Sequence, residues 1–128
     1  MRTEKKILVV EDDPHINELI FNLLTTRGYS VASAVTGEEA VEYVKSKTPD
    51  LVVLDLLLPK LDGWDVCKVL RGAGAKTAKV PILIVSVLSR FDSVIEDPEL
   101  TNVSFFSKPF ESADLVKEVD RILDESRQ

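Results

Sequence analysis

Five short runs rich in apolar residues recur along the 128-residue chain, and longer segments with helical periodicity separate them. An amphipathic helix repeats its apolar residues every three or four positions, whereas a strand buried on both faces is apolar throughout. Strands that alternate with helices imply a parallel sheet covered by helices on both faces. We therefore predict an α/β domain of five strand–helix units, with strands at residues 6–10, 29–34, 51–55, 80–86 and 103–106.

Residues that begin and end helices lie where this interpretation needs them. Pro14 behind Asp13 is typical of a first helical turn with an aspartate cap, and Gly28 ends this first helix. Thr36 followed by Glu39 is a capping-box sequence that opens a second helix. The remaining helices are predicted over residues 63–71, after Ser89 (ended early by Pro98) and from Ser112.

Helical periodicity also predicts which side chains of these helices face the sheet. The spacing of the apolar residues places one stripe on each helix. The predicted stripes are Ile16, Leu19, Ile20, Leu23 and Leu24 in the first helix, Ala40, Val41 and Val44 in the second, and Leu115, Val116, Val119, Ile122 and Leu123 in the last.

The composition narrows the classes of function. The length suits one domain, spanning residues 1–128, that buries a core without metal or disulfide staples. A net charge of −6 argues against direct nucleic-acid binding, and no apolar run is long enough for membrane insertion. Cys67 is the single cysteine, which allows no internal disulfide and suits a cytoplasmic location. The single histidine, His15, excludes a multi-histidine metal site.

Asp55 stands inside the otherwise apolar stretch LVVLDLLLP. A charge is costly in such surroundings unless something pairs with it. In open α/β sheets the functional crevice lies at the carboxyl ends of the strands, and the other polar residues of interest fall at that edge. They are Glu11, Asp12 and Asp13 after the first strand, Ser86 at the end of the fourth and Lys108 after the fifth.

Converging carboxylates repel one another unless their pKa values rise or a cation lies among them. Oxygen ligands favour a hard cation, and Mg²⁺ is the natural choice. Lys108 adds a positive charge and Ser86 a hydroxyl donor, so the group suits the binding of a phosphoryl group. Asp55 is then the expected nucleophile, and its product is an aspartyl phosphate.

In its motifs the chain resembles the receiver domain of bacterial two-component response regulators. The segments that carry the resemblance are VVEDD, LVVLDLLLP with Gly63 beyond it, ILIVS and KPF, in this order over nearly the whole chain. The resemblance implies a flavodoxin-like (βα)5 three-layer sandwich with a central five-stranded parallel sheet in the order 2-1-3-4-5. It also implies a signalling switch rather than a conventional enzyme, one that catalyses only its own aspartyl phosphorylation and dephosphorylation.

The resemblance further implies partners and residue roles. A histidine kinase or phosphotransfer protein donates the phosphoryl group to Asp55, and a downstream protein or an effector domain outside this chain responds. The implied Mg²⁺ ligands are Glu11 (through water), Asp12, Asp55 and the backbone carbonyl of Leu57. Ser86 and Lys108 are the implied catalytic partners, Ser86 and Phe105 the implied switch residues, and the Lys108–Pro109 peptide bond is expected to be cis. Signals are expected to leave through the fourth helix, the fifth strand and the fifth helix.

Several positions depart from the family pattern. Val87 replaces a usually small residue, and its bulk is expected to narrow access to Asp55. Leu57 and Leu88 are expected to exclude water and so to prolong the life of the phosphoryl group. The segment EDPELTNVS lacks the Gly-Ala-Asp-Asp sequence that supports one family of dimers.

Two alternative functions remain open at this point. Val87 and the irregular fourth helix favour an interaction module that keeps the fold without phosphorylation. A Mg²⁺-dependent phosphatase of the aspartyl-phosphate kind lacks a recognisable substrate cap and a second general acid.

Overall fold

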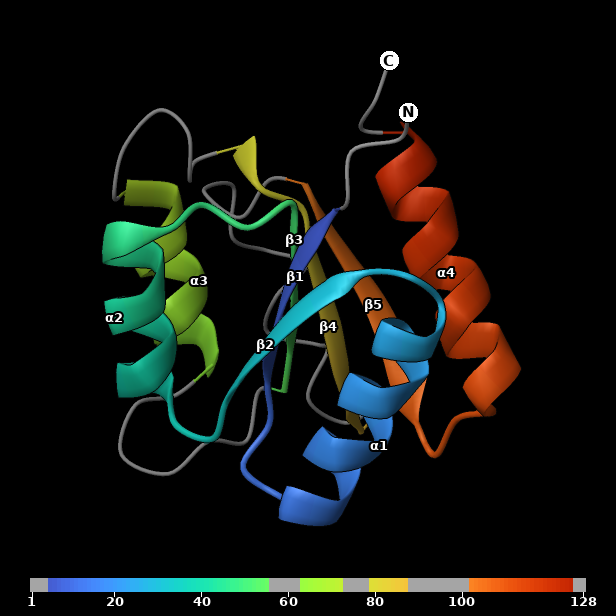
Figure 1. Cartoon of the computed structure of the whole chain (residues 1–128). Helices are drawn as coiled ribbons and strands as arrows, with labels where there is room; N and C mark the ends of the chain where they lie inside the picture. Colours follow the sequence, from blue (N-terminus) through green and yellow to red (C-terminus); the bar gives the residue numbers. More distant parts are fainter. Residues whose placement is uncertain (1–4, 56–62, 73–78, 88–101, 126–128) are drawn as a thin grey trace.

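The computed structural model of the chain describes residues 5–55, 63–72, 79–87 and 102–125. Its strands are β1 (Lys6–Val10), β2 (Ser30–Ala34), β3 (Leu51–Leu54), β4 (Ile82–Val87) and β5 (Val103–Lys108). Its helices are α1 (Pro14–Thr26), α2 (Gly37–Ser46), α3 (Gly63–Gly72) and α4 (Ser112–Glu125). The strands form one parallel sheet in the order β2-β1-β3-β4-β5 (Figure 1). The predicted α/β fold with this strand order is confirmed.

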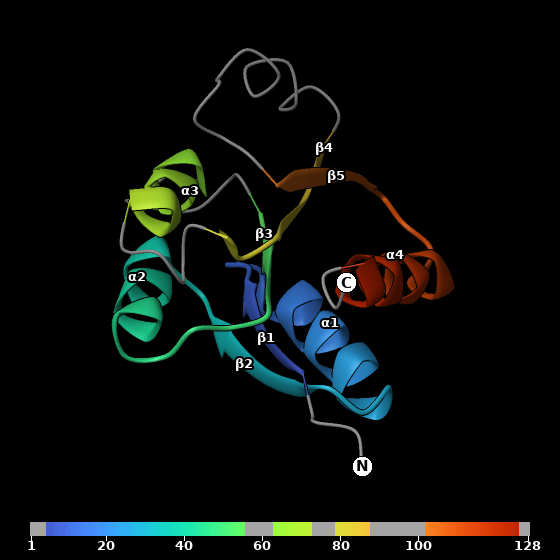
Figure 2. The same ribbon diagram turned by 90° about the horizontal axis from the view of Figure 1, so that it is seen from above.

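The helices cover the two faces of the sheet in pairs. Helices α1 and α4 lie on one face, and α2 and α3 lie on the other (Figure 2). Alternate residues of β1 therefore enter different cores: Ile7 and Val9 pack with α1 and α4, whereas Leu8 and Val10 pack with α2 and α3. Both faces of the sheet need apolar side chains, which explains the uniformly apolar strands.

The same division holds at β5, an edge strand. Phe105 packs against the core under α2 and α3, and its neighbour Phe106 packs against the core under α1 and α4. Every side chain of β5 is only partly buried, in contrast to the buried residues of β3. Consecutive residues of this one strand thus belong to opposite halves of the molecule.

Helix α1 is delimited by the residues that the sequence indicated. The Asp13 carboxylate accepts hydrogen bonds from the backbone N–H of His15 (2.9 Å) and of Ile16 (3.3 Å). At the other end Gly28 adopts a φ of 104°, a left-handed conformation that glycine accepts without strain. Gly28 N–H bonds to the Thr25 carbonyl and Tyr29 N–H to the Leu24 carbonyl, which is a Schellman ending.

The start of α2 also follows the prediction. The Thr36 hydroxyl accepts the N–H of Glu39 at 3.1 Å, as an N-cap should. Ala40 and Val44 are buried, while Val41 is half-buried. The inward face of α2 was therefore predicted well, with Val41 at its margin.

One part of the predicted inward stripe of α1 is wrong. Leu19 is 44% exposed, whereas Asn17 is buried and only 6% exposed. Asn17 precedes the buried residues Ile20 and Leu24 by three and seven positions and so shares their face of the helix. Leu19 points away from that face. Leu19 was predicted to face the core because its side chain is apolar. Its position on the helix turns it towards solvent, and the polar residue Asn17 takes the inward position.

Several strand boundaries also differ from the prediction. Strand β4 begins at Ile82 rather than residue 80, because Pro81 has no N–H to donate to a ladder. Strand β5 continues to Lys108, since its pairing with β4 extends to Val87. Lys108 was expected after the strand, but it is the last residue of the strand. Smaller differences occur at Tyr29, which precedes β2, and at Asp55, which follows β3.

Some predictions fall outside the described residues. They concern the fourth helix with Pro98, the carbonyl and side chain of Leu57, the side chains of Val87 and Leu88, and most of the segment EDPELTNVS. Among the described residues, no helix combines the length and the apolar composition that crossing a membrane requires.

Candidate functional site

Four polar residues lie at the carboxyl edge of the sheet. Glu11 directly follows β1, Asp55 directly follows β3, Ser86 lies near the end of β4, and Lys108 ends β5. These four strands are consecutive neighbours in the sheet. Backbone N–H groups of Glu11 and Asp55 still bond to adjacent strands, at 3.0 Å each, so the sheet holds both acids in place.

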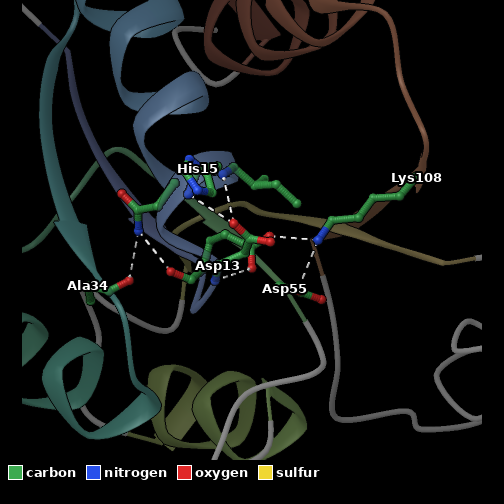
Figure 3. A network of polar contacts seen from close by, with 8 residues as sticks. Asp13, His15, Ala34, Asp55 and Lys108 are labelled. Atoms are coloured by element: carbon green, nitrogen blue, oxygen red, sulfur yellow. Dashed lines mark hydrogen bonds and ion pairs between the residues drawn. The ribbon is translucent and has the colours of Figure 1, made fainter.

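Lys108 joins two of these acids across the sheet edge. Its Nζ lies 2.6 Å from Oε1 of Glu11 and 3.0 Å from Oδ2 of Asp55 (Figure 3). The carboxylates are almost completely buried, and the side chain of Lys108 is 18% exposed. Ion pairs removed from water in this way are costly to break, because the remaining charge loses its partner in a poorly solvated place.

The Glu11 carboxylate is engaged through both oxygens. Oε1 accepts the ammonium of Lys108, and Oε2 accepts the backbone N–H of Asp13 at 3.1 Å. Burial raises the pKa of Glu11, the hydrogen bond from Lys108 opposes that rise, and the nearby charge of Asp55 adds to it, so that the pKa of Glu11 lies at about 7. A buried acid with a pKa shifted this far is typical of functional sites.

Lys108 is the positively charged partner of these acids, and its pKa is shifted as well. Burial alone would lower its pKa, but the hydrogen bonds to Glu11 and Asp55 outweigh burial and raise the pKa above its ordinary value. The side chain therefore keeps its positive charge across the whole physiological range. It supplies a fixed cation beside Asp55.

Asp12 completes an acidic group with the two buried acids. One carboxylate oxygen each of Glu11, Asp12 and Asp55 lies within 4.8 Å of the others, and Asp12 is exposed to solvent. A set of carboxylate oxygens open on one side suits a hard divalent cation that retains water ligands, such as Mg²⁺. Asp13, by contrast, caps α1, in agreement with the sequence interpretation.

The two proposed switch residues are placed differently. Ser86 is 1% exposed, and its hydroxyl oxygen has no hydrogen-bond partner among the described residues. A buried hydroxyl in this state is able to donate to a newly arrived acceptor. Phe105 is half-buried against the core under α2 and α3 and is not part of the polar group. The Lys108–Pro109 peptide bond is cis, as expected.

One residue of the site region was missed by sequence reasoning. Asn17 of α1 donates from Nδ2 to the carbonyl oxygen of Glu11 (2.9 Å) and to that of Ala34 (3.2 Å). The available signal was its position, because an amide on the inward face of a helix must find polar partners in the interior.

A family model for the response regulator receiver domain matches residues 7–120. The probable transcriptional regulator ycf27 of Porphyridium aerugineum is 39% identical over 120 residues, covering 94% of this chain and 48% of the relative. The DNA-binding dual master transcriptional regulator RpaA of Synechocystis sp. is 34% identical over 118 residues, covering 92% of this chain and 48% of the relative. The chain thus spans about half the length of these curated relatives.

Solved structures match over the full domain. A putative response regulator from Chloroflexus aurantiacus has a TM-score of 0.84 and 33% identity, with 95% of this chain and 99% of that chain covered. The receiver domain of the sensor histidine kinase PA1611 from Pseudomonas aeruginosa, which holds a magnesium ion in its active-site cleft, has a TM-score of 0.83 and 26% identity. That match also covers 95% of this chain and 99% of the other. The likeness therefore extends over the whole fold rather than a single motif.

Proposed function

Because the chain belongs to the response regulator receiver domain family, a family of signalling proteins rather than conventional enzymes, we propose that it works as a switch through phosphorylation of Asp55. The observation that carries the proposal is the ammonium of Lys108 between Glu11 and Asp55. It places a fixed positive charge at the carboxylate that is to receive the phosphoryl group.

The proposed reaction is a transfer from a phosphorylated histidine of a kinase or phosphotransfer protein. A carboxylate oxygen of Asp55 forms the new O–P bond, the N–P bond of the donor breaks, and its electron pair returns to the imidazole nitrogen. Charge accumulates on the phosphoryl oxygens during this transfer. Lys108 stabilises one of these oxygens, and the hydroxyl of Ser86 donates to another.

Mg²⁺ is the proposed cofactor. Asp12 and Asp55 are proposed to hold it directly and Glu11 through water, with the carbonyl of Leu57 as a further ligand. The ion supplies positive charge that compensates the crowded acids and the incoming phosphoryl group. Support comes from the chemistry of the donor set and from the magnesium ion in the related receiver domain of PA1611.

The proposed output is a change of surface that a downstream protein or effector domain reads. The expected route is the segment between β4 and β5, then β5 itself, then α4, the last helix. Phe105 is the proposed aromatic switch within this route. A cytoplasmic location belongs to the same proposal.

The prediction of no direct nucleic-acid binding needs a correction at the level of the whole protein. A relative that is named a DNA-binding regulator matches over only 48% of its length. For this chain alone, the net charge of −6 disfavours contact with phosphate backbones.

The test is incubation with acetyl phosphate and Mg²⁺, followed by intact mass spectrometry. The wild type is expected to gain one phosphoryl group, and Asp55→Asn none. Asp124→Asn is the matched control, since Asp124 is exposed on α4, and it should be phosphorylated like the wild type. A wild type that gains no adduct would support the alternative of an interaction module without phosphorylation.

A further inference from the structure

Asn17 is a buried polar residue beside the site, and the proposed reaction does not use it. It lies on the inward face of α1 and is 6% exposed. Its side-chain amide donates two hydrogen bonds, to the carbonyl oxygens of Glu11 and Ala34, which lie just past the end of β1 and at the end of β2 (Figure 3). The amide therefore joins one helix to two strands at the edge where the acids converge.

These bonds complete the restraint of the backbone around Glu11. The N–H of Glu11 already donates to the carbonyl of Ala34 at 3.0 Å. Asn17 holds the carbonyl of Glu11 itself, which belongs to the peptide group between Glu11 and Asp12. Both peptide groups that flank Glu11 are thus fixed, one by the sheet and one by Asn17.

Asp13, two residues after Glu11, is bonded to the same helix. The backbone N–H of Asn17 donates to the carbonyl of Asp13 at 2.9 Å, while the Asp13 side chain caps α1. The turn from Glu11 to Asp13 is consequently bonded to Asn17 at both of its ends. The directions in which the carboxylates of Glu11 and Asp12 leave this turn depend on the orientation of the peptide group between them.

We propose that Asn17 is a positioning residue for the cation site: its amide orients the Glu11–Asp12 peptide so that these two carboxylates converge with that of Asp55. This inference rests on the proposed function, because it concerns the affinity of the same site for Mg²⁺. In this proposal Asn17 is not itself a ligand of the ion. It acts on the backbone that carries the ligands.

The first experiment measures Mg²⁺ binding by isothermal titration calorimetry with MgCl₂ alone. Asn17→Leu keeps a similar volume but removes both donors, and Mg²⁺ is expected to bind about tenfold more weakly, the lower end of effects seen for partners of metal ligands. Asn22→Leu is the matched control, the same change at an exposed position of α1, and should bind like the wild type.

A second control separates positioning from stability. Ile20→Val shortens a buried side chain of the same helix and lowers stability without touching the site backbone. It should keep the wild-type affinity at a temperature where all variants are folded. Equal affinity in Asn17→Leu and the wild type, or equal weakening in Asn17→Leu and Ile20→Val, would overturn the proposal.

Amide hydrogen exchange gives a reading that does not depend on the metal. In Asn17→Leu the amides of Glu11 and Asp13, which donate to the Ala34 carbonyl and to the Glu11 carboxylate, are expected to exchange faster, with Leu8 in the middle of β1 unchanged. If Asn17→Leu does not fold, Asn17→Ser serves instead: its hydroxyl can reach at most one of the two carbonyls, so a smaller change in the same direction is expected. Unchanged exchange at Glu11 and Asp13 refutes the proposal.

Different outcomes refute the proposed function and the proposed role of Asn17. A wild type that binds no Mg²⁺ and takes up no phosphoryl group refutes the proposed function, while the exchange comparison still decides whether Asn17 orients the peptide. A wild type that does both, together with an Asn17→Leu variant of unchanged affinity and exchange, refutes only the role of Asn17.

Discussion

Lys108 is the residue on which the electrostatic balance of the site depends. It contacts Glu11 and Asp55, and both are nearly fully buried. Neither acid can exchange the ammonium for water, as an exposed ion pair would. The removal of Lys108 should therefore lower the free energy of unfolding more than the removal of a surface lysine.

We expect Lys108→Met to lower the free energy of unfolding by roughly 3 kcal/mol without Mg²⁺, because two buried carboxylates lose their partner. Added Mg²⁺ should restore part of the loss, since a divalent cation compensates the same acids. Urea unfolding with and without Mg²⁺ measures both effects. Lys117→Met, at an exposed position of α4, is the control and should change little. Equal losses in the two variants would contradict the expectation.

The polar residues of the site show what a sequence can reveal at this scale. Asp55 and Lys108 were found because charged residues next to apolar strands are conspicuous. Asn17 was not found, because its significance depends on the direction in which a helical side chain points, and on carbonyls of two different strands. Such contacts between a side chain and a distant backbone leave no pattern in the sequence.

At the scale of elements, one carboxylate of α4 bonds to two residues that follow α1. Asp120 of α4 accepts two hydrogen bonds from the guanidinium of Arg27 and one from the hydroxyl of Tyr29. Burial, followed by the bond to Asp120, raises the pKa of Tyr29 well above its ordinary value. These contacts connect the end of α1 to the middle of the last helix.

The raised pKa of Tyr29 predicts a pH dependence of stability. The folded state binds the phenolic proton more tightly than the unfolded state, so the stabilisation is complete below the ordinary tyrosine pKa and is lost as the pH rises above it. Tyr29→Phe should therefore show a shallower loss of stability above about pH 10 than the wild type. Chemical unfolding at several alkaline pH values measures this slope.

A spectroscopic reading tests the same assignment. The chain has two tyrosines, and the tyrosinate absorbance that appears last on raising the pH should vanish in Tyr29→Phe. Its persistence in that variant would show that Tyr29 is not the shifted group.

Element boundaries show the limits of prediction at this scale. The first two helices were predicted well because Asp13, Gly28 and Thr36 carry recognisable capping chemistry. The extension of β5 to Lys108 was missed, because strand length is decided by pairing with β4 rather than by the residues Ser107 and Lys108 themselves.

For the whole molecule, the fold followed from the alternation of apolar strands and amphipathic helices, which leaves few arrangements besides a covered parallel sheet. The strand order came from the family resemblance, because periodicity does not show which strands are neighbours. The two cores on either side of the sheet are what make the apolar strands necessary.

Cation binding should stabilise the whole domain by mass action, since the unfolded chain does not assemble the acidic group. At a free Mg²⁺ concentration ten times Kd, the free energy of unfolding should rise by about 1.4 kcal/mol. Denaturant unfolding across a Mg²⁺ series measures the rise, with the salt concentration held constant by NaCl. Asp55→Asn removes a carboxylate from the acidic group, so Mg²⁺ should raise the free energy of unfolding of this variant by less. A gain of equal size in this variant would exclude Asp55 from the cation site.

The alternation of Phe105 and Phe106 between opposite cores has a mechanical consequence. Because the two successive rings pack against opposite cores, a twist or shift of this strand changes the packing on both faces of the sheet. Lys108, at the tip of that strand, is bonded to the acids of the site. We therefore expect a displacement of the Lys108 ammonium to be transmitted through β5 to the helices on both faces of the sheet.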